Sequence, residues 1–314
     1  MSETLRFRTF ARVIKCNRLA RVISNLFERN LMRIGICGAG TMGRGIAIAT
    51  AQAGIECRIF DPSTKVMDAC MTAISDTFNK AVQKQKMSAE EADEALVRCN
   101  ASTSLSEMAD CDLVIEAIVE LPDAKNTLFR ELESIVTDNC ILATNTSSIA
   151  IASLSRHLRC PQRFIGLHFF NPANIMKLVE IIRAPQTTDD VVKIATEFSI
   201  HLGKSPAIAR DVPGFIVNRV ARNFYNESQR IVTEGAATIT QVDTIMKSAG
   251  FKMGPFELMD LIGVDVNLSV TKSMYEQYFY EPRFQPSGLQ QYYVDAGLHG
   301  RKTGRGFYDY TKST

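Results

Sequence analysis

The sequence predicts an α/β protein: a doubly wound parallel sheet followed by a smaller all-helical domain. Three observations predict this architecture. Short apolar, strand-like runs alternate with helical patterns from Met32 to about Asp211, which is the order that a parallel sheet requires. A glycine-rich turn joins the first strand to the first helix. After Asp211–Gly214 only helical periodicity remains, so we expect an extension over 1–31, the sheet domain over 32–211 and the helical domain over 212–314.

The first strand and helix enclose a candidate phosphate-binding turn. Met32–Cys37 is a short apolar run, and a helical pattern follows the glycines until Gly54. In a Rossmann-like dinucleotide-binding fold, the first glycine permits a tight turn and the second lets the backbone approach a pyrophosphate, while the third allows close helix packing. The helix start adds free N–H groups and the positive end of its dipole. The expected cofactor contacts are Gly38, Gly40, Thr41, Met42 and Gly43.

The second strand indicates which dinucleotide is bound. Ile55–Phe60 ends in Asp61, which lies 21 residues after Gly40. A carboxylate at this point suits the ribose hydroxyls of NAD and repels the 2′-phosphate of NADP. We therefore expect NAD as the cofactor, while Arg58 and Lys65 leave NADP open as the alternative.

Two later apolar runs are expected to be buried strands of the same sheet. Cys140–Ala143 and Phe164–Phe170 are short, apolar and followed by turn residues, as buried strands are. Asn145 follows the first run, where strand ends meet the crevice of a doubly wound sheet. We expect Asn145 to contact the cofactor.

His168 and Glu180 form a candidate acid–base pair. They lie 12 residues apart, with the turn-like Asn171–Asn174 between them. If Phe164–Phe169 and Lys177–Ile182 pair as antiparallel neighbours, the ring and the carboxylate point to the same face and touch. The carboxylate would orient the imidazole and stabilise its protonated form, as a general acid/base near neutral pH requires. The alternative is a core histidine satisfied by a nearby acid.

The helical domain is expected to consist of at least three helical segments. Gly214 to about Glu234 carries apolar residues at helical spacing, as in a long, partly buried helix. Thr240–Asp243 predicts a capping box that opens a second helix, which ends at Gly250. Gly254-Pro255 breaks the chain, and Phe256–Tyr280 supplies the last helical region.

Composition favours a globular protein and excludes several classes of function. Hydrophobic residues make up 46% of the 314-residue chain and charged residues 22%, which argues against disorder. No apolar run approaches the roughly 18–20 residues that span a bilayer, so we expect no membrane partner. The eight cysteines include neither a CxxC pair nor a Cys/His cluster with metal-ligand spacing, so we expect no metal. Cys37, Cys57, Cys111 and Cys140 lie in apolar runs, as buried thiols in a reducing compartment do.

Seven motifs together carry a wider resemblance. They are Gly38–Gly43, Asn145–Ser148, His168–Pro172, Met176–Glu180, Pro213–Arg219, Met253–Leu258 and Gly300–Tyr308. With these motifs the chain resembles the 3-hydroxyacyl-CoA dehydrogenase family, of the 3-hydroxybutyryl-CoA dehydrogenase type, from about Met32 to Tyr310. The middle motifs are specific to this family, because the related sugar-acid dehydrogenases usually lack the His-Phe-Phe-Asn-Pro form.

The resemblance implies NAD-dependent, reversible oxidation of an (S)-3-hydroxyacyl-CoA to the 3-oxoacyl-CoA, as in β-oxidation and butyryl-CoA metabolism. His168 would take the proton from the 3-hydroxyl, with Glu180 as its orienting partner. Ser147 would hydrogen-bond the reacting oxygen, and Asn218 would contact the substrate's oxygens. Because removal of a hydride leaves an electron-poor carbon, the new carbonyl needs hydrogen-bond donors in place.

The resemblance also implies further binding residues and a homodimer. Glu120 and Lys125 would contact the cofactor, and the alternative is an ordinary solvated helix start. Lys80 is the expected contact to the phosphates of CoA, with Lys84 and Lys86 as further candidates. Relatives often show a Lys-Gly-Lys pattern here, whereas this chain has Gln-Lys-Gln-Lys, so a solvated charged face is an equal alternative. Members with this helical domain are typically dimers.

The positive charge of the chain is concentrated in its first 31 residues. They carry a net charge of +5 and the remainder −3, so the body gives no reason to expect nucleic-acid binding. An apolar stripe over Leu19–Phe27 with arginines beside it is typical of a mitochondrial transit segment. Two acidic residues and few serines favour instead a dispensable extension on a cytoplasmic bacterial enzyme.

Two other functions stay open at this point. A related dehydrogenase would act on a hydroxy acid or sugar acid without CoA. A non-catalytic protein would use the same fold as a nucleotide sensor or structural component, because fold alone does not fix activity.

Overall fold

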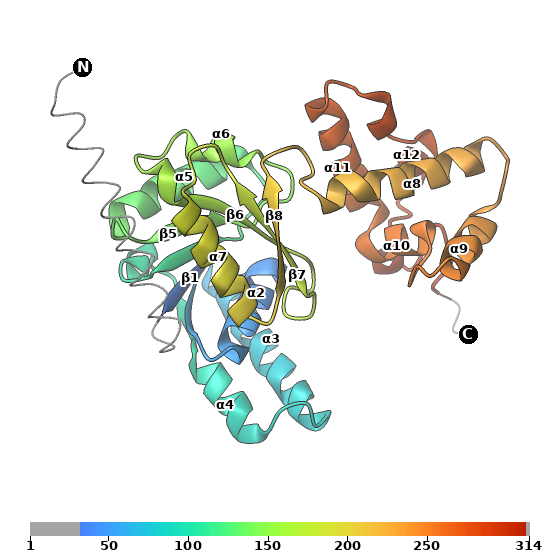
Figure 1. Cartoon of the computed structure of the whole chain (residues 1–314). Helices are drawn as coiled ribbons and strands as arrows, with labels where there is room; N and C mark the ends of the chain where they lie inside the picture. Colours follow the sequence, from blue (N-terminus) through green and yellow to red (C-terminus); the bar gives the residue numbers. More distant parts are fainter. Residues whose placement is uncertain (1–31, 312–314) are drawn as a thin grey trace, which may run out of the picture. The chain divides into compact units, whose positions relative to one another are not determined.

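The computed structural model describes residues 32–311, which form two compact units divided between Asp211 and Val212 (Figure 1). The extension over 1–31, with its expected amphipathic stripe, lies outside the described residues. None of the helices within 32–311 has both the length and the apolar character that crossing a bilayer requires.

The first unit contains an eight-stranded sheet among the described residues, in the order β3-β2-β1-β4-β5-β6-β7-β8. All neighbouring strands are parallel except β6 and β7, which are antiparallel. The strand order reverses direction between β1 and β4, as in a doubly wound fold, and this confirms the predicted fold class. The strands are β1 Arg33–Cys37, β2 Glu56–Phe60, β3 Cys99–Ser102, β4 Leu113–Glu116, β5 Ile141–Thr144, β6 Phe164–Phe169, β7 Leu178–Arg183 and β8 Ser205–Arg210.

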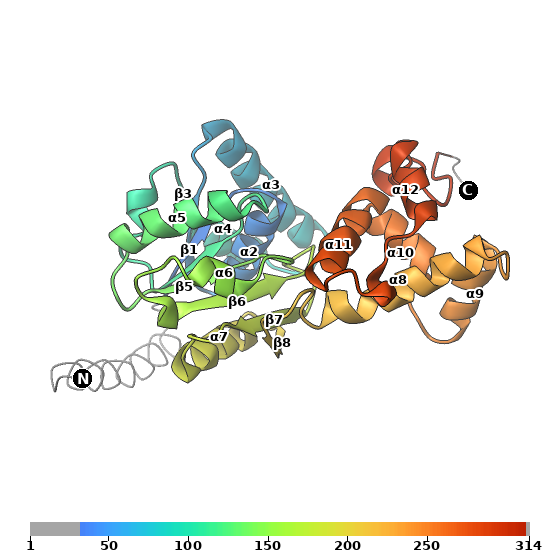
Figure 2. The ribbon, with the colours of Figure 1, turned by 90° about the horizontal axis from the view of Figure 1, so that it is seen from above.

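Helices cover both faces of this sheet, with α7 on the opposite side from α5 and α6 (Figure 2). Apolar residues of α2 and α7, such as Ile46 and Ile194, share one core cluster with alternate strand residues. On the other face Phe129 of α5 packs edge-on against Phe164, with ring centroids 4.7 Å apart. The helical segments are α2 Thr41–Gln52, α3 Thr64–Gln83, α4 Ala89–Val97, η1 Leu105–Met108, α5 Pro122–Ile135, α6 Ile151–Ser155, η2 Pro161–Arg163 and α7 Asp189–His201.

The second unit is built from helices around its own apolar core. Buried Tyr225, Phe256, Met259 and Val264 belong to one cluster, so this unit does not depend on the sheet for its hydrophobic interior. The segments are α8 Val217–Thr233, α9 Ile239–Ser248, α10 Pro255–Ile262, α11 Val264–Gln277, η3 Pro282–Phe284, α12 Gly288–Asp295 and η4 Arg301–Thr303.

Three boundaries of these helices differ from the sequence prediction. The capping box of α9 uses Thr238 and Gln241, not Thr240 and Asp243, because the Asp243 carboxylate accepts hydrogen bonds elsewhere. Helix α8 begins at Val217 and not at Gly214, since Gly214 has a φ of +74° and the next residue 49°, outside the helical range. The predicted helical region over Phe256–Tyr280 is divided at Gly263, whose φ is 106°.

Two buried carboxylates fix the C-terminal segment of the second unit. Asp260, 1% exposed, accepts hydrogen bonds from the backbone N–H groups of Phe307 and Tyr308 at 2.9 Å and from the Tyr310 hydroxyl at 3.0 Å. Asp243 accepts from the Phe256 N–H and from the Tyr308 hydroxyl. The motif Gly300–Tyr308 therefore closes this unit through charge-assisted hydrogen bonds.

Replacement Asp260→Ala is expected to destabilise the protein by about 3 kcal/mol, because it leaves one buried and one partly buried N–H group and a hydroxyl without their acceptor. Urea denaturation followed by far-UV circular dichroism measures this change. The exposed Asp295→Ala is the matched control and should stay within about 0.5 kcal/mol of the wild type. An equal, small effect of both substitutions would contradict the assigned role of Asp260.

Candidate active site

The predicted site residues of the first unit gather at the carboxyl edge of the sheet. The glycine turn follows β1, Asp61 follows β2, Glu120 follows β4 and Asn145 follows β5. His168 lies near the end of β6. Since these strands are parallel, their carboxyl ends meet at one edge, where open α/β sheets bind ligands.

The glycine turn has the close contacts that its motif implies. Gly38 has a φ of +109°, and a Cβ on it would lie 2.5 Å from the Ala117 carbonyl oxygen. A Cβ on Gly43 would lie 1.8 Å from the Gly38 carbonyl oxygen, so no side chain fits there. Gly40 instead has nothing within 4 Å of its ideal Cβ position, which leaves space for a ligand to approach the backbone.

The start of α2 fits an anionic group. Its N-cap residue Gly40 makes no side-chain capping bond, and the first turn contains no acidic residue. The N-terminal N–H groups therefore lack the side-chain acceptor that most helix starts have. Asp61 Oδ2 accepts a hydrogen bond from the Ala39 N–H at 3.1 Å, and its Oδ1 accepts from the Ser63 N–H. The carboxylate is thus held beside the turn, as ribose binding requires.

The antiparallel pairing of β6 and β7 brings His168 directly opposite Glu180. His168 Nδ1 lies 2.7 Å from Glu180 Oε2, and the two residues are 6% and 0% exposed. The predicted contact is therefore confirmed. Neighbouring Leu167 and Phe169 enter the apolar core on the α7 side, so the alternation of a strand points His168 to the other face.

The loop after His168 is fixed by a buried lysine that sequence reasoning missed. Lys204, 7% exposed, donates from Nζ to the carbonyl oxygens of Ala173 at 2.6 Å and Met176 at 3.0 Å. Burial and the nearby Lys177 charge lower the pKa of Lys204. Asn145 secures the same region from β5, because its Oδ1 accepts the Phe169 N–H at 2.8 Å.

Glu120 organises the loop that carries the two serines. Its Oε1 accepts hydrogen bonds from the Thr146 hydroxyl at 2.5 Å and from the Ser147 N–H at 2.9 Å. The Ser147 and Ser148 hydroxyls lie 3.5 and 3.2 Å from the same oxygen. Partial burial raises the pKa of Glu120, but the Lys125 charge and these hydrogen bonds outweigh it, so that its pKa lies below the usual value.

Lys125 is buried, which contradicts the alternative of an ordinary solvated helix start. It is 1% exposed, and its ammonium group lies 2.5 Å from Glu116 Oε1 and 3.1 Å from Glu120 Oε2. Burial raises the pKa of Glu116, partly offset by Lys125 and by the Thr144 hydroxyl. Sequence reasoning missed Glu116, although a charged residue closing the apolar run of Leu113–Ile115 was a signal of it.

The remaining predicted residues are not brought to this edge by the described contacts. Asn218 lies in the first turn of α8, in the second unit, so its placement beside His168 stays a prediction. Lys80 is in the last turn of α3 and exposed, and Lys84 and Lys86 follow it, also exposed. Their contact to CoA likewise stays a prediction.

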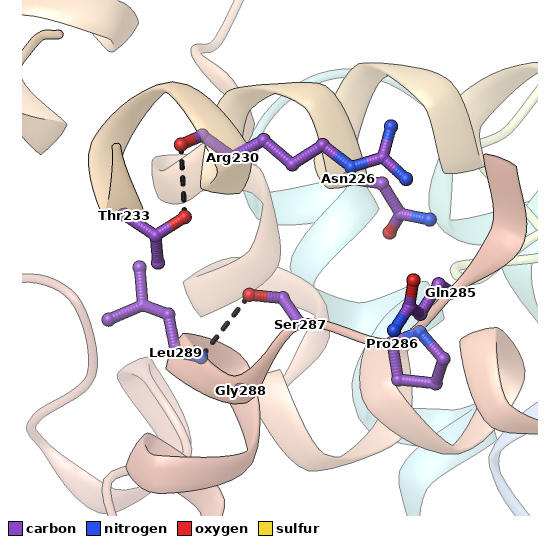
Figure 3. Close-up of a pocket in the computed structure, with 8 residues that line it drawn as sticks. All are labelled: Asn226, Arg230, Thr233, Gln285, Pro286, Ser287, Gly288 and Leu289. Atoms are coloured by element: carbon purple, nitrogen blue, oxygen red, sulfur yellow. Dashed lines mark hydrogen bonds between the residues drawn. The ribbon is translucent and has the colours of Figure 1, made fainter. Parts of the chain in front are cut away.

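The second unit contains a pocket of about 410 Å³ between α8 and the start of α12 (Figure 3). Its polar lining includes Asn226, Arg230, Gln285 and Ser287, without an acidic residue, histidine or cysteine. The Ser287 hydroxyl already accepts from the Leu289 N–H at 3.2 Å. The pocket therefore lacks the groups needed for acid–base chemistry. Within residues 32–311, no group of His, Cys, Asp or Glu side chains has the arrangement of a metal site.

Family comparisons agree with this division of the chain. The model of the 3-hydroxyacyl-CoA dehydrogenase NAD binding domain matches residues 33–212. The model of the 3-hydroxyacyl-CoA dehydrogenase C-terminal domain matches residues 214–310. Together they span nearly all of the described residues, so the glycine turn and the His168–Glu180 pair both belong to the NAD-binding domain.

Individual relatives give the same result. The chain is 41% identical over 280 residues to a probable 3-hydroxybutyryl-CoA dehydrogenase of Deinococcus radiodurans, covering 89% of this chain and 100% of that protein. It is 40% identical over 282 residues to the 3-hydroxyadipyl-CoA dehydrogenase of Escherichia coli, but covers only 59% of that protein and 90% of this chain. The crystal structure of (S)-3-hydroxybutyryl-CoA dehydrogenase PaaH1 from Ralstonia eutropha is similar with a TM-score of 0.86 and 38% identity, over 89% of this chain and 99% of that one.

Gly40 and Gly43, the second and third glycines of the turn, are expected to respond differently to replacement by alanine. Gly40→Ala should leave the melting temperature unchanged but weaken NADH binding, because its Cβ would enter the open space where a phosphate approaches. Gly43→Ala should lower the melting temperature, because its Cβ collides with the backbone. Fluorescence titration with NADH and thermal unfolding measure the two effects. Undiminished NADH affinity of Gly40→Ala would argue against cofactor binding at this turn.

Proposed function

The chain belongs to the 3-hydroxyacyl-CoA dehydrogenase family, and we propose that it is an NAD-dependent (S)-3-hydroxyacyl-CoA dehydrogenase of the 3-hydroxybutyryl-CoA type. The reaction is the reversible oxidation of the 3-hydroxyl group to a 3-oxoacyl-CoA. One observation carries the proposal above all others: a histidine paired with a fully buried carboxylate lies at the sheet edge that also holds the glycine turn.

The geometry of the pair defines the proton chemistry. When Nδ1 of His168 donates to Glu180, the lone pair of the neutral ring is on Nε2, which is the atom that takes the 3-hydroxyl proton. Glu180 then stabilises the imidazolium ion, and its burial fixes the orientation of the ring. NAD, when bound, supplies the hydride acceptor for oxidation and, as NADH, the donor for the reverse reaction.

The other predicted residues complete this proposal. Ser147 donates a hydrogen bond to the reacting oxygen, and Asn218 contacts the substrate's oxygens from the helical unit. The cofactor is held by the glycine turn with Thr41 and Met42 and by Asp61, Glu120, Lys125 and Asn145. Lys80 contacts a phosphate of CoA. The support for the cofactor residues is their arrangement at one edge of the sheet.

We further propose that the protein is a homodimer whose interface lies on the helical unit. Among the described residues, this unit exposes ten large apolar side chains, including Val220 at 67% and Phe279 at 91%, against eight in the larger sheet unit. Such an excess of exposed apolar groups is typical of an association surface. Light scattering after size-exclusion chromatography measures the mass directly.

A cytoplasmic location is proposed from the bacterial origin of the two nearly full-length relatives compared above. The mitochondrial matrix is the alternative if residues 1–31 serve as a transit segment. Fractionation of the native cells distinguishes the two.

His168→Ala is expected to lower kcat by about 10²–10⁴-fold while NADH still binds, because the general base is lost and the nucleotide contacts stay. His168→Gln, which keeps a donor for the buried Glu180, should show a similar loss. Turnover is followed at 340 nm, and NADH binding by fluorescence. His201→Ala is the control, since this exposed histidine is the last residue of α7 and its Nε2 contacts the backbone carbonyl oxygen of Ala53. Near-normal turnover of both His168 variants would exclude His168 as the base.

Acetoacetyl-CoA is expected to be reduced with a kcat/KM at least about 100-fold above that of free acetoacetate, because the CoA moiety supplies binding energy remote from the reacting carbon. The assay compares the two substrates, and 3-oxoacyl-CoAs of increasing length, with NADH and NADPH in parallel. Equal values for thioester and free acid would favour the CoA-independent hydroxy-acid alternative. NADPH as the better cofactor would contradict the argument from Asp61.

A further inference from the structure

Glu116 occupies an unusual environment for a carboxylate with no predicted role. It is the last residue of β4 and 0% exposed. Within the described residues its carboxylate accepts three hydrogen bonds. Oε1 accepts from the Ile118 N–H at 2.8 Å and from Lys125 Nζ at 2.5 Å, and Oε2 accepts from the Thr144 hydroxyl at 2.6 Å. Such a set stabilises the ionised form and fixes both oxygens.

The contacts of Glu116 continue to the serine loop through two routes. The first runs through Lys125, whose ammonium group is shared between Glu116 and Glu120. The second runs through Thr144, whose hydroxyl donates to Glu116 and accepts the Thr146 N–H at 3.3 Å. Both routes end at the Glu120–Thr146 contact, which is adjacent to Ser147. The buried Glu116 carboxylate is therefore connected to the loop that carries Ser147 and Ser148.

We propose that Glu116 is a positioning residue: by holding the buried ammonium group of Lys125, it sets the place of Glu120 and of the Ser147–Ser148 loop. The inference deepens the proposed function, since it assumes that this loop contacts cofactor and substrate. With Glu116 ionised, two carboxylates share one ammonium group, and Glu120 remains available to the Thr146 hydroxyl and the loop N–H groups. Without that charge, Glu120 is the one ionic partner that Lys125 keeps among residues 32–311, and the ammonium group draws it away from the loop.

Stability alone does not account for this arrangement. A buried ion pair is often no more stabilising than apolar residues of similar volume, because both charges must be taken out of water. A purely structural role predicts that loss of the charge lowers the melting temperature and leaves the ligand affinity of the folded protein unchanged. A positioning role predicts a change in affinity and turnover at temperatures where the variant is fully folded.

Glu116→Gln is the most direct test. The amide keeps the shape of the side chain, and with its oxygen towards Lys125 and the Ile118 N–H its NH₂ group faces the Thr144 hydroxyl, which is able to accept. The charge is lost, and the Thr144 hydroxyl changes from donor to acceptor in this contact. We expect the Kd for NADH to rise by about tenfold or more and kcat with acetoacetyl-CoA to fall by a similar factor, the effect typical of losing a group that orients a contact residue. Fluorescence titration gives the Kd without requiring turnover.

Glu133→Gln is the matched control on the same helix as Lys125. Glu133 is also a buried carboxylate, 5% exposed, with donors around it: the backbone N–H groups of Arg159 and Cys160 at 2.8 and 3.0 Å. Its partners lie in the segment before β6 and not in the serine loop. Glu133→Gln should lower the melting temperature while the NADH Kd stays within about twofold of the wild type.

A double-mutant comparison tests the route through Lys125. If Glu116 acts through Lys125, adding Glu116→Gln to Lys125→Met should not weaken NADH binding further. Lys125→Met alone leaves the buried Glu116 carboxylate without its cation, whereas the double variant also removes the negative charge of Glu116. If Lys125→Met does not fold, the contrast between Glu116→Gln and Glu133→Gln in NADH binding still decides whether Glu116 is a positioning residue.

Two outcomes would overturn the inference: an NADH Kd and kcat of Glu116→Gln within about twofold of the wild type, or equal effects of Glu116→Gln and Glu133→Gln on NADH binding. Failure of the proposed function is a different result. In that case the wild-type protein binds NADH but reduces no 3-oxoacyl-CoA, and the NADH titrations still decide the role of Glu116.

Discussion

The reversal of strand direction between β6 and β7 is the constraint on which the candidate site depends. Every other pair of neighbours in the sheet is parallel, and a parallel partner for β6 would need a crossover of a dozen or more residues. The antiparallel turn instead places Glu180 opposite His168 in one short connection. Asn145 and Lys204 then hold the end of β6 and the loop that follows it. The acid–base pair is thus a consequence of topology and not only of side-chain choice.

The two buried acid–base pairs at this edge have the character of preorganised groups. Glu180 and Glu116 are both fully buried, and each faces a basic side chain, His168 or Lys125, at 2.5–2.7 Å. Burying such pairs gains little net stability, because desolvation offsets the attraction. In a low-dielectric setting, however, a charge that is already in place acts strongly on its neighbours and needs no reorganisation during a reaction. Their position at the ligand-binding edge is consistent with this use.

Much of this fold and part of the site followed from the sequence because the signals were local or periodic. The glycine turn, Asp61 and the His168–Glu180 contact each follow from strand alternation and short spacing. Other features depend on which distant segments meet. Lys125 is buried because it pairs with Glu116 on the neighbouring strand β4. The capping box of α9 begins at Thr238 and not at the predicted Thr240, because Asp243 accepts a hydrogen bond from α10. Asn218 lies in the second unit, so its predicted role depends on the arrangement of the two units. The spacing of residues along the sequence does not determine that arrangement.

A division of labour among the acidic residues follows from their distance to the strand ends. Glu116 and Glu180 lie within their strands, are fully buried and contact the basic side chains of Lys125 and His168. Asp61 and Glu120 lie one and four residues beyond a strand, partly exposed, and accept from backbone N–H groups of the turns. Glu116 and Glu180 therefore act on neighbouring side chains, whereas Asp61 and Glu120 lie past the strand ends, where open α/β sheets bind ligands. The same residue type therefore orients the site from within the sheet and is proposed to contact ligands from its edge.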